Sequence, residues 1–124
     1  MTEHSVAIQN ELHRLVPKIV EALTPVPELI LLFGSAARGT ATRESDADVI
    51  VVWETALRPV DRLGVVWPLF DAFSRHVDLF VMTPEEWQNW RTTAVGDRKT
   101  LLDEGVVLYE WGKYVGTEVP QRKM

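Results

Sequence analysis

The 124-residue chain contains no cysteine, no long apolar run and no excess of positive charge. The absence of cysteine excludes disulfides and thiolate metal sites, and it suits a protein of the reducing cytoplasm. No apolar stretch reaches the ~20 residues that a membrane-spanning helix needs, and the N-terminus lacks the basic and apolar regions of a signal peptide. A net charge of −5 argues against charge-driven binding of nucleic acid. We therefore expect a cytoplasmic protein with neither a membrane nor a nucleic acid as its partner.

The remaining composition is that of a folded protein. Apolar residues make up 46% of the chain, which is enough for a hydrophobic core. The length is usual for one domain, and the sequence shows no repeat, low-complexity segment or internal linker. We predict a single domain over residues 1–124, with a core at about 26–111, an N-terminal helix at about 4–23 and a loose polar tail at 112–124.

Apolar periodicity predicts the secondary structure. Apolar residues three and four positions apart indicate helices, and continuous apolar runs rich in valine and isoleucine indicate buried strands. Thr83, Pro84 and Glu86 have the spacing of a capping box with proline at the first helical position, so a helix is expected to begin there. The expected elements are helix 4–23, strand 28–33, short helix 35–40, strand 46–53, helix 58–74, strand 76–82, helix 84–95, short helix 97–104 and strand 106–111.

The lengths of the connections predict the topology. The segment between the first two strands is short for a parallel crossover, so these strands are expected to be antiparallel neighbours. The second and third strands are joined through a long helix, which favours a right-handed parallel crossover. The predicted fold is α/β (α+β), a small mixed sheet of three or four strands flanked by helices. One edge of this sheet would collect the corner Gly34-Ser35 and the carboxylates of Asp46, Asp48 and Asp78.

These carboxylates have the pattern of a metal site. Asp46 and Asp48 point to the same side because residues two apart in a strand share a face. Asp78 lies in an otherwise apolar strand, and carboxylate oxygens are the ligands that Mg²⁺ prefers. Taken singly, Asp46 and Asp48 also fit a strand start facing water, and Asp78 fits a surface pair with Arg75. Taken together with a glycine corner suited to phosphate, they indicate a metal and a nucleotide.

The same residues resemble a known family. The run Phe33-Gly34-Ser35-Ala36-Ala37-Arg38-Gly39, the run Ser45-Asp46-Ala47-Asp48, the isolated Asp78 and the ending Glu104-Gly105-Val106-Val107-Leu108-Tyr109 resemble the minimal nucleotidyltransferase (MNT) domain of the DNA polymerase β-like superfamily. The resemblance implies a Mg²⁺-dependent enzyme that uses ATP or another nucleoside triphosphate. It implies that Asp46, Asp48 and Asp78 hold metal and act in catalysis, and that Gly34 and Ser35 hold phosphates.

Other residues near this pattern allow two interpretations. Arg38 and Arg43 are candidates to offset phosphate charge as bidentate donors. The alternative is that they are ordinary surface arginines in contact with water. His76 lies two residues before Asp78, and a surface position at the strand start is favoured over tuning of Asp78. Trp87 and Trp90 share one helix face, where packing on the sheet is favoured over an exposed patch for a partner.

The resemblance also implies a biological setting. MNT domains often accompany a helical HEPN partner, in toxin–antitoxin modules whose MNT protein transfers AMP to the toxin. Larger relatives carry an added substrate domain that this chain lacks, which favours a protein acceptor in an oligomer with that partner. Two alternatives stay open: a catalytically vestigial protein that neutralises a partner by contact, and a nucleotidyltransferase acting on a small molecule such as an antibiotic.

Overall fold

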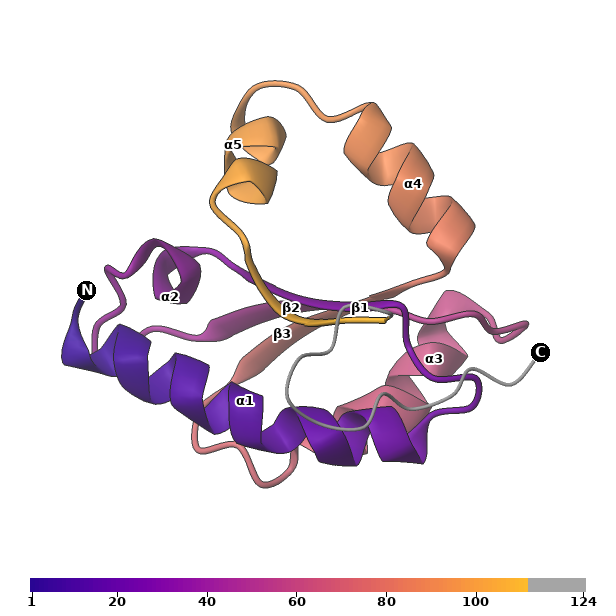
Figure 1. Cartoon of the computed structure of the whole chain (residues 1–124), viewed down its shortest axis with the longest axis horizontal. Helices are drawn as coiled ribbons and strands as arrows, with labels where there is room; N and C mark the ends of the chain where they lie inside the picture. The colour runs from indigo at the N-terminus through magenta and orange to yellow at the C-terminus, as the bar shows by residue number, and fades with distance from the viewer. Residues whose placement is uncertain (112–124) are drawn as a thin grey trace.

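The computed structural model describes residues 1–111, which form a four-stranded sheet with helices on both faces (Figure 1). The predicted loose tail at 112–124 lies outside the described residues. Within residues 1–111 no helix is both long and apolar enough to cross a bilayer. The elements are α1 (Glu3–Ala22), β1 (Leu29–Phe33), α2 (Ser35–Arg38), β2 (Ala47–Val52), α3 (Pro59–Val66), the 3₁₀ helix η1 (Trp67–Phe70), β3 (Val77–Met82), α4 (Pro84–Thr92), α5 (Asp97–Asp103) and β4 (Val106–Glu110).

The strand order is β3-β2-β1-β4, and the sheet is mixed. Strand β1 runs antiparallel to both β2 and β4, whereas β2 and β3 are parallel, so the predicted strand directions are confirmed. The register places Phe33 opposite Asp48, and Asp48 opposite Asp78. The end of β1 and the starts of β2 and β3 therefore meet at one edge of the sheet.

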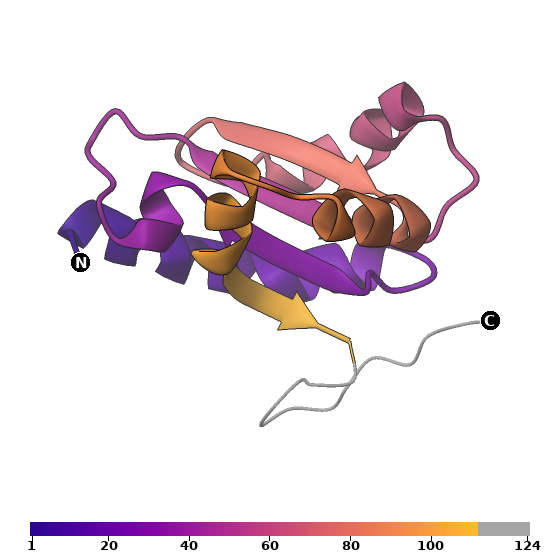
Figure 2. The ribbon, with the colours of Figure 1, turned by 90° about the horizontal axis from the view of Figure 1, so that it is seen from above.

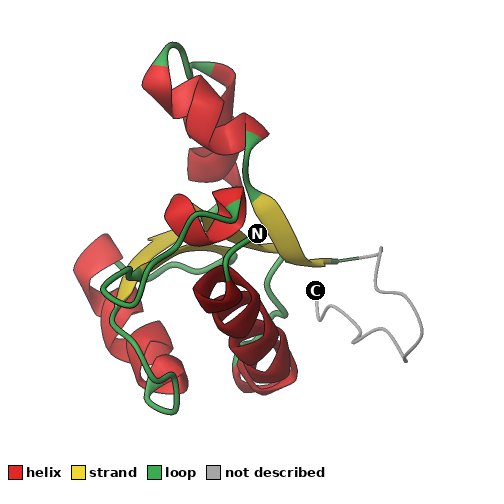
Figure 3. Cartoon of the chain, turned by 90° about the vertical axis from the view of Figure 1, so that its left-hand side faces the viewer, coloured by secondary structure: helices red, strands yellow, loops and turns green. Residues whose placement is uncertain are grey.

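Helix α1 covers one face of the sheet and builds the main core. Its residues Ile8, Leu12 and Ile19 are almost fully buried and belong to one cluster with Ile30 and Leu32 of β1. The helix begins at Glu3, where the Thr2 side chain accepts a hydrogen bond from the Ser5 N–H. Figure 3 shows α1 and α3 on this side of the sheet and α4 and α5 on the other.

The opposite face is covered less completely. Helices α4 and α5 lie over it (Figure 2), and α4, described in full, has no fully buried residue. Trp87 and Trp90 stack with ring centroids 5.8 Å apart and pack partly buried against a small cluster on this face, so the predicted packing on the sheet is confirmed. Phe80 of β3 stays 46% exposed. The carboxylates of the candidate site share this less covered face.

Several predicted helices end earlier than expected: α2 ends at Arg38 and α4 at Thr92, against predicted ends at 40 and 95, and the helix over 58–74 differs most. The sequence pattern predicted a helix over 58–74, but α3 ends at Val66 and continues as η1 from Trp67 to Phe70. Pro68 is the physical reason, because proline has no N–H for the next α-helical hydrogen bond and its ring crowds the preceding turn. The apolar spacing persists into η1, which is why the spacing alone did not reveal the break.

Arg62 joins α3 to α4 and is only 5% exposed. Its guanidinium donates to both carboxylate oxygens of Glu86, at 2.7 and 3.2 Å, and to the carbonyls of Leu57 and Val81. Glu86 also completes the predicted capping box with Thr83 at the start of α4. The hydrogen bond from Arg62 is the main cause that lowers the pKa of Glu86. This ion pair therefore fixes where α4 leaves the sheet.

Arg62→Met is expected to destabilise the protein by about 2–4 kcal/mol, because it leaves two carbonyls and a carboxylate without their donor. The half-exposed carboxylate of Glu86 regains water, which keeps the loss below that of a fully buried pair. Arg58→Met is the matched control, since its ion pair with Asp61 is exposed and such pairs contribute about 0–1 kcal/mol. Urea denaturation measures both, and equal effects of the two substitutions would contradict the structural role of Arg62.

Candidate functional site

Strand register brings the three predicted carboxylates together. Asp48 and Asp78 are neighbours across the parallel pair β2–β3, and Asp46 lies two residues before Asp48. One ligand atom each from Asp46, His76 and Asp78 lie within 4.8 Å of one another, and all three residues are exposed. Asp48 is more deeply placed, between Phe33 of β1 and Asp78 of β3. The starts of two parallel strands thus form one carboxylate cluster.

The electrostatics of this cluster disfavour a charge on Asp48. Burial, and next the carboxylates of Asp78 and Asp46, raise the pKa of Asp48 to about 6, while Arg38 acts to lower it. Neighbouring carboxylates raise one another's pKa, and a nearby cation lowers it again. Oxygen donors in this number, open to solvent, fit a hard divalent cation. The donor set therefore fits the metal that the sequence pattern predicted.

Gly34 forms a corner directly against Asp48. It follows β1 with φ +79° and ψ −158°, a conformation that is essentially confined to glycine. A Cβ at this position would collide with the Asp48 carboxylate. Ser35 then starts α2, and the Gly34 carbonyl accepts hydrogen bonds from the N–H groups of Ala37 and Arg38. The corner and the carboxylates are therefore one site, while phosphate binding by Gly34 and Ser35 stays a prediction.

The two predicted arginines lie in different places. Arg38, at the end of α2, is close enough to Asp48 to act on its pKa, and it pairs with Glu104 at 3.8 Å. Arg43 lies in the loop before β2, with its side chain 84% exposed and 3.5 Å from Glu44. Arg38 therefore lies beside the site in this structure, and a role of Arg43 toward phosphate stays a prediction.

Arg75 corrects one interpretation of the sequence. It was a candidate partner of Asp78, but its guanidinium donates instead to the carbonyls of Thr42, Arg43 and Ser45 and contacts Nδ1 of His4. Arg75 thereby holds the loop that leads into Asp46. No residue pattern signals this role, because the acceptors are backbone carbonyls some thirty residues away.

His76 is the residue whose contact with the site was underestimated. It is exposed, as expected for a strand start, but its Nε2 lies 3.1 Å from Oδ1 of Asp78. The ring also meets Trp67 edge-on, with centroids 6.4 Å apart. The spacing of two residues within a strand was the available signal, since it places His76 and Asp78 on one face.

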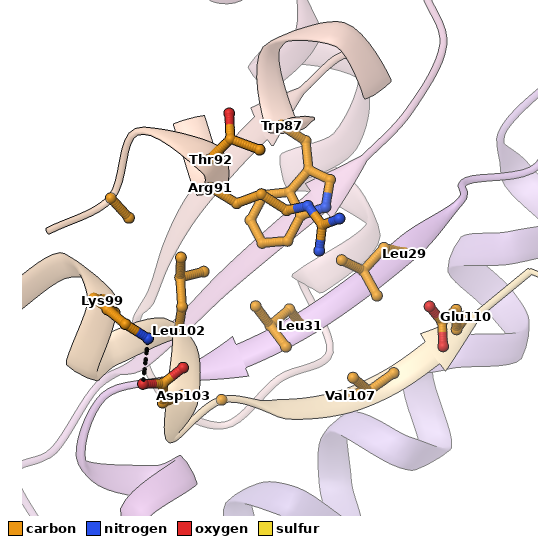
Figure 4. A pocket seen from close by; sticks show the side chains of 12 residues that line it. Leu29, Leu31, Trp87, Arg91, Thr92, Lys99, Leu102, Asp103, Val107 and Glu110 are labelled. Atoms are coloured by element: carbon orange, nitrogen blue, oxygen red, sulfur yellow. Dashed lines mark hydrogen bonds and ion pairs between the residues drawn. The ribbon is translucent and has the colours of Figure 1, made fainter. Parts of the chain in front are cut away.

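A separate cavity of about 560 Å³ lies on the same face of the sheet, between α4, α5 and the strands β1 and β4 (Figure 4). Leu29, Leu31, Trp87 and Leu102 give it an apolar floor and walls. Charged side chains occupy its margin, among them Arg91 and the exposed pair of Lys99 with Asp103. This lining includes no member of the carboxylate cluster.

Comparison with known proteins identifies the class of this fold and site. The profile of the nucleotidyltransferase domain matches residues 13–108, which include β1, β2, β3 and the whole carboxylate cluster. The chain therefore belongs to the nucleotidyltransferase domain family, enzymes that use a nucleoside triphosphate and a divalent metal. The predicted family resemblance and the predicted fold class are both confirmed.

Solved structures share the fold at low sequence identity. A nucleotidyltransferase-type protein of Sulfolobus solfataricus is 22% identical, with a TM-score of 0.65 over 90% of this chain and 87% of that one. A toxin–antitoxin complex with AMP-PNP matches at 24% identity, with a TM-score of 0.54 over 85% of this chain and 75% of that one. A mutant MntA–HpeT toxin–antitoxin complex matches at 22% identity and a TM-score of 0.52, with the same coverage. No curated protein matches the sequence significantly.

Proposed function

We propose that the protein transfers AMP from ATP to a hydroxyl group of a partner protein, a HEPN-type toxin, and thereby acts as an MNT-type antitoxin. The observation that carries this proposal is the convergence of Asp46, Asp48 and Asp78 against the Gly34 corner. Membership in the nucleotidyltransferase family supports the reaction type. Structural similarity to toxin–antitoxin complexes, one of them holding an ATP analogue, supports the partner and the nucleotide.

Each residue has a role in the proposed reaction. Gly34 and Ser35 receive the β- and γ-phosphates, while Arg38 and Arg43 offset their charge. Asp46, Asp48 and Asp78 hold Mg²⁺. The bound cation neutralises charge on the triphosphate and lowers the pKa of the acceptor hydroxyl.

The proposed transfer is a displacement at the α-phosphorus. The acceptor oxygen attacks in line, the bond from the α-phosphorus to the bridging oxygen breaks, and pyrophosphate leaves. Asp78, on the exposed strand β3, takes the proton of the acceptor hydroxyl. The product is a phosphate ester that joins AMP to the partner. The bridging oxygen remains on pyrophosphate, so the reaction needs no further reactant.

The openness of the site favours a protein acceptor. Asp46 and Asp78 are exposed, and the neighbouring Phe80, which contacts Phe33 with ring centroids 5.8 Å apart, is 46% exposed. A partner that docks over this part of the sheet would supply the hydroxyl and close the site against water. We therefore propose that the working state is an oligomer with the partner.

The test is incubation of the protein with Mg²⁺, labelled ATP and the purified product of the neighbouring gene. We expect label on the partner, loss of its toxicity, and loss of both effects with Asp46→Asn. Partner neutralisation that survives in Asp46→Asn and Asp48→Asn, with no nucleotide turned over, would establish the alternative of a protein that acts by contact alone.

A further inference from the structure

We infer that His76 is a nitrogen ligand of the metal centre and that this chain consequently prefers Mn²⁺ to Mg²⁺. The inference rests on the proposed function only in placing a divalent cation among Asp46, Asp48 and Asp78. It adds a nitrogen donor beside Asp46 and Asp78, and it changes the expected metal from the one that an all-carboxylate site would take.

The placement of His76 is the first support. One donor atom from each of Asp46, His76 and Asp78 lie within 4.8 Å of one another. Two donors bound to one ion at about 2.1 Å are at most about 4.2 Å apart. The three exposed side chains therefore reach a common ion through shifts of less than about 1 Å, which rotation about their own bonds provides.

The surroundings of His76 hold it beside the cluster. Its backbone carbonyl accepts a hydrogen bond of 3.1 Å from the N–H of Ala47, the residue between Asp46 and Asp48. The Trp67 ring lies against the imidazole in a T-shaped arrangement, with ring centroids 6.4 Å apart. The backbone of His76 is thus paired with the strand that carries Asp48, and its Nε2 lies 3.1 Å from Oδ1 of Asp78.

The competing explanation is an ordinary surface pair between His76 and Asp78. Such an exposed pair contributes about 0–1 kcal/mol, so it gives little reason for an imidazole at this position. A neutral imidazole, by contrast, adds a donor to three crowded carboxylates without adding a fourth negative charge. A ligand role therefore explains the position of His76 better than pairing does.

The identity of the donor then determines the metal preference. Mg²⁺ takes oxygen ligands almost exclusively and keeps much of its water. Imidazole nitrogen suits first-row transition metals rather than Mg²⁺, and Mn²⁺ is the first-row metal that shares the carboxylate and water ligands of Mg²⁺. A site that joins the imidazole of His76 to the carboxylates of Asp46 and Asp78 is therefore expected to bind Mn²⁺ more tightly than Mg²⁺.

The test is Mn²⁺ binding to the full chain at pH 8. Titration followed by electron paramagnetic resonance measures affinity, with Mg²⁺ as competitor, and pulsed resonance on protein with ¹⁵N-labelled histidine detects directly bound nitrogen. We expect nitrogen coupling and at least about tenfold preference for Mn²⁺. His76→Gln is expected to lose the coupling and to weaken Mn²⁺ binding about 10- to 100-fold, with Mg²⁺ binding little changed.

The control is His13→Ala, because His13 is an exposed histidine on α1. It is expected to leave both the coupling and the affinity unchanged. Mn²⁺ bound without nitrogen coupling, or bound no more tightly than Mg²⁺, overturns the inference and leaves the proposed AMP transfer standing. Failure of both ions to bind overturns the inference and also the metal site of the proposed function.

Discussion

Asp48→Asn is expected to abolish nucleotidyl transfer and, in the absence of metal, to stabilise the protein at neutral pH. The loss of transfer follows from removing one carboxylate that holds the cation. Several kcal/mol of transition-state charge stabilisation depend on that cation, which corresponds to about a thousandfold or more in rate. The gain in stability follows from the unusual pKa of the same carboxyl group.

The direction of the stability change comes from proton linkage. The pKa of Asp48 is about 6 in the folded protein, against 3.8 for an unperturbed carboxyl, mainly because of burial. The folded chain therefore binds more protons than the unfolded chain between these pH values, and the free energy of unfolding falls as pH rises from about 4 to about 6. Above about pH 6 the folded wild-type protein bears the full free-energy cost of an ionised Asp48. The uncharged asparagine of the variant bears no such cost.

Thermal unfolding in EDTA at pH 4 and pH 8 measures this effect. Asp48 is partly solvated, so the expected gain at pH 8 is on the order of 1 kcal/mol, or about 4 °C in melting temperature. At pH 4 the two proteins are expected to melt together. Asp71→Asn, at an exposed aspartate after η1, is the control for replacing a surface aspartate by asparagine. A less stable Asp48→Asn at pH 8 would contradict this electrostatic account.

Gly34→Ala is expected to reduce transfer by about a hundredfold or more. The new Cβ collides with the Asp48 carboxylate, and the backbone at φ +79° and ψ −158° is strained for any residue with a side chain. Either the corner or Asp48 must move, and displacements of about 1 Å in a catalytic site cost about 10²-fold in rate. Unfolding is also expected to become easier, by about 1–3 kcal/mol.

Gly64→Ala separates the site effect from the general effect of replacing glycine. Gly64 lies within α3, and a Cβ there meets no atom within 4 Å. Alanine in a helix interior is expected to stabilise by about 0.5–1 kcal/mol and to leave the transfer rate unchanged. Transfer rates and melting temperatures of both variants provide the comparison. Wild-type activity in Gly34→Ala would show that the corner does not face the reacting groups.

The sequence predicted most of the fold because its signals were local. The short connection from Ser35 to Asp46 determined that β1 and β2 are antiparallel, and the Thr83 and Glu86 capping pattern marked the start of α4. The α3 boundary was missed because Pro68 sits within an apolar spacing that continues past it. The single domain over 1–124 stays a prediction.

The candidate site was predictable in its carboxylates and less so in its surroundings. Strand periodicity and crossover direction were enough to bring Asp46, Asp48 and Asp78 to one edge. The contacts of Arg75 with the loop before Asp46 depend on a long side chain reaching backbone carbonyls, which no residue pattern encodes. The incomplete cover over Phe80 likewise depends on how α4 leaves the sheet, which the buried Arg62 determines.

The central claim is that the cluster of Asp46, Asp48 and Asp78 transfers the nucleotide portion of ATP to a partner. Parallel reactions with ATP labelled at the α-phosphate and at the γ-phosphate test it most directly. We predict that the partner acquires the α label and never the γ label, that one pyrophosphate is released for each label transferred, and that Asp46→Asn stops both. Partner labelled from the γ-phosphate, or α label transferred equally well by Asp46→Asn, would contradict the claim.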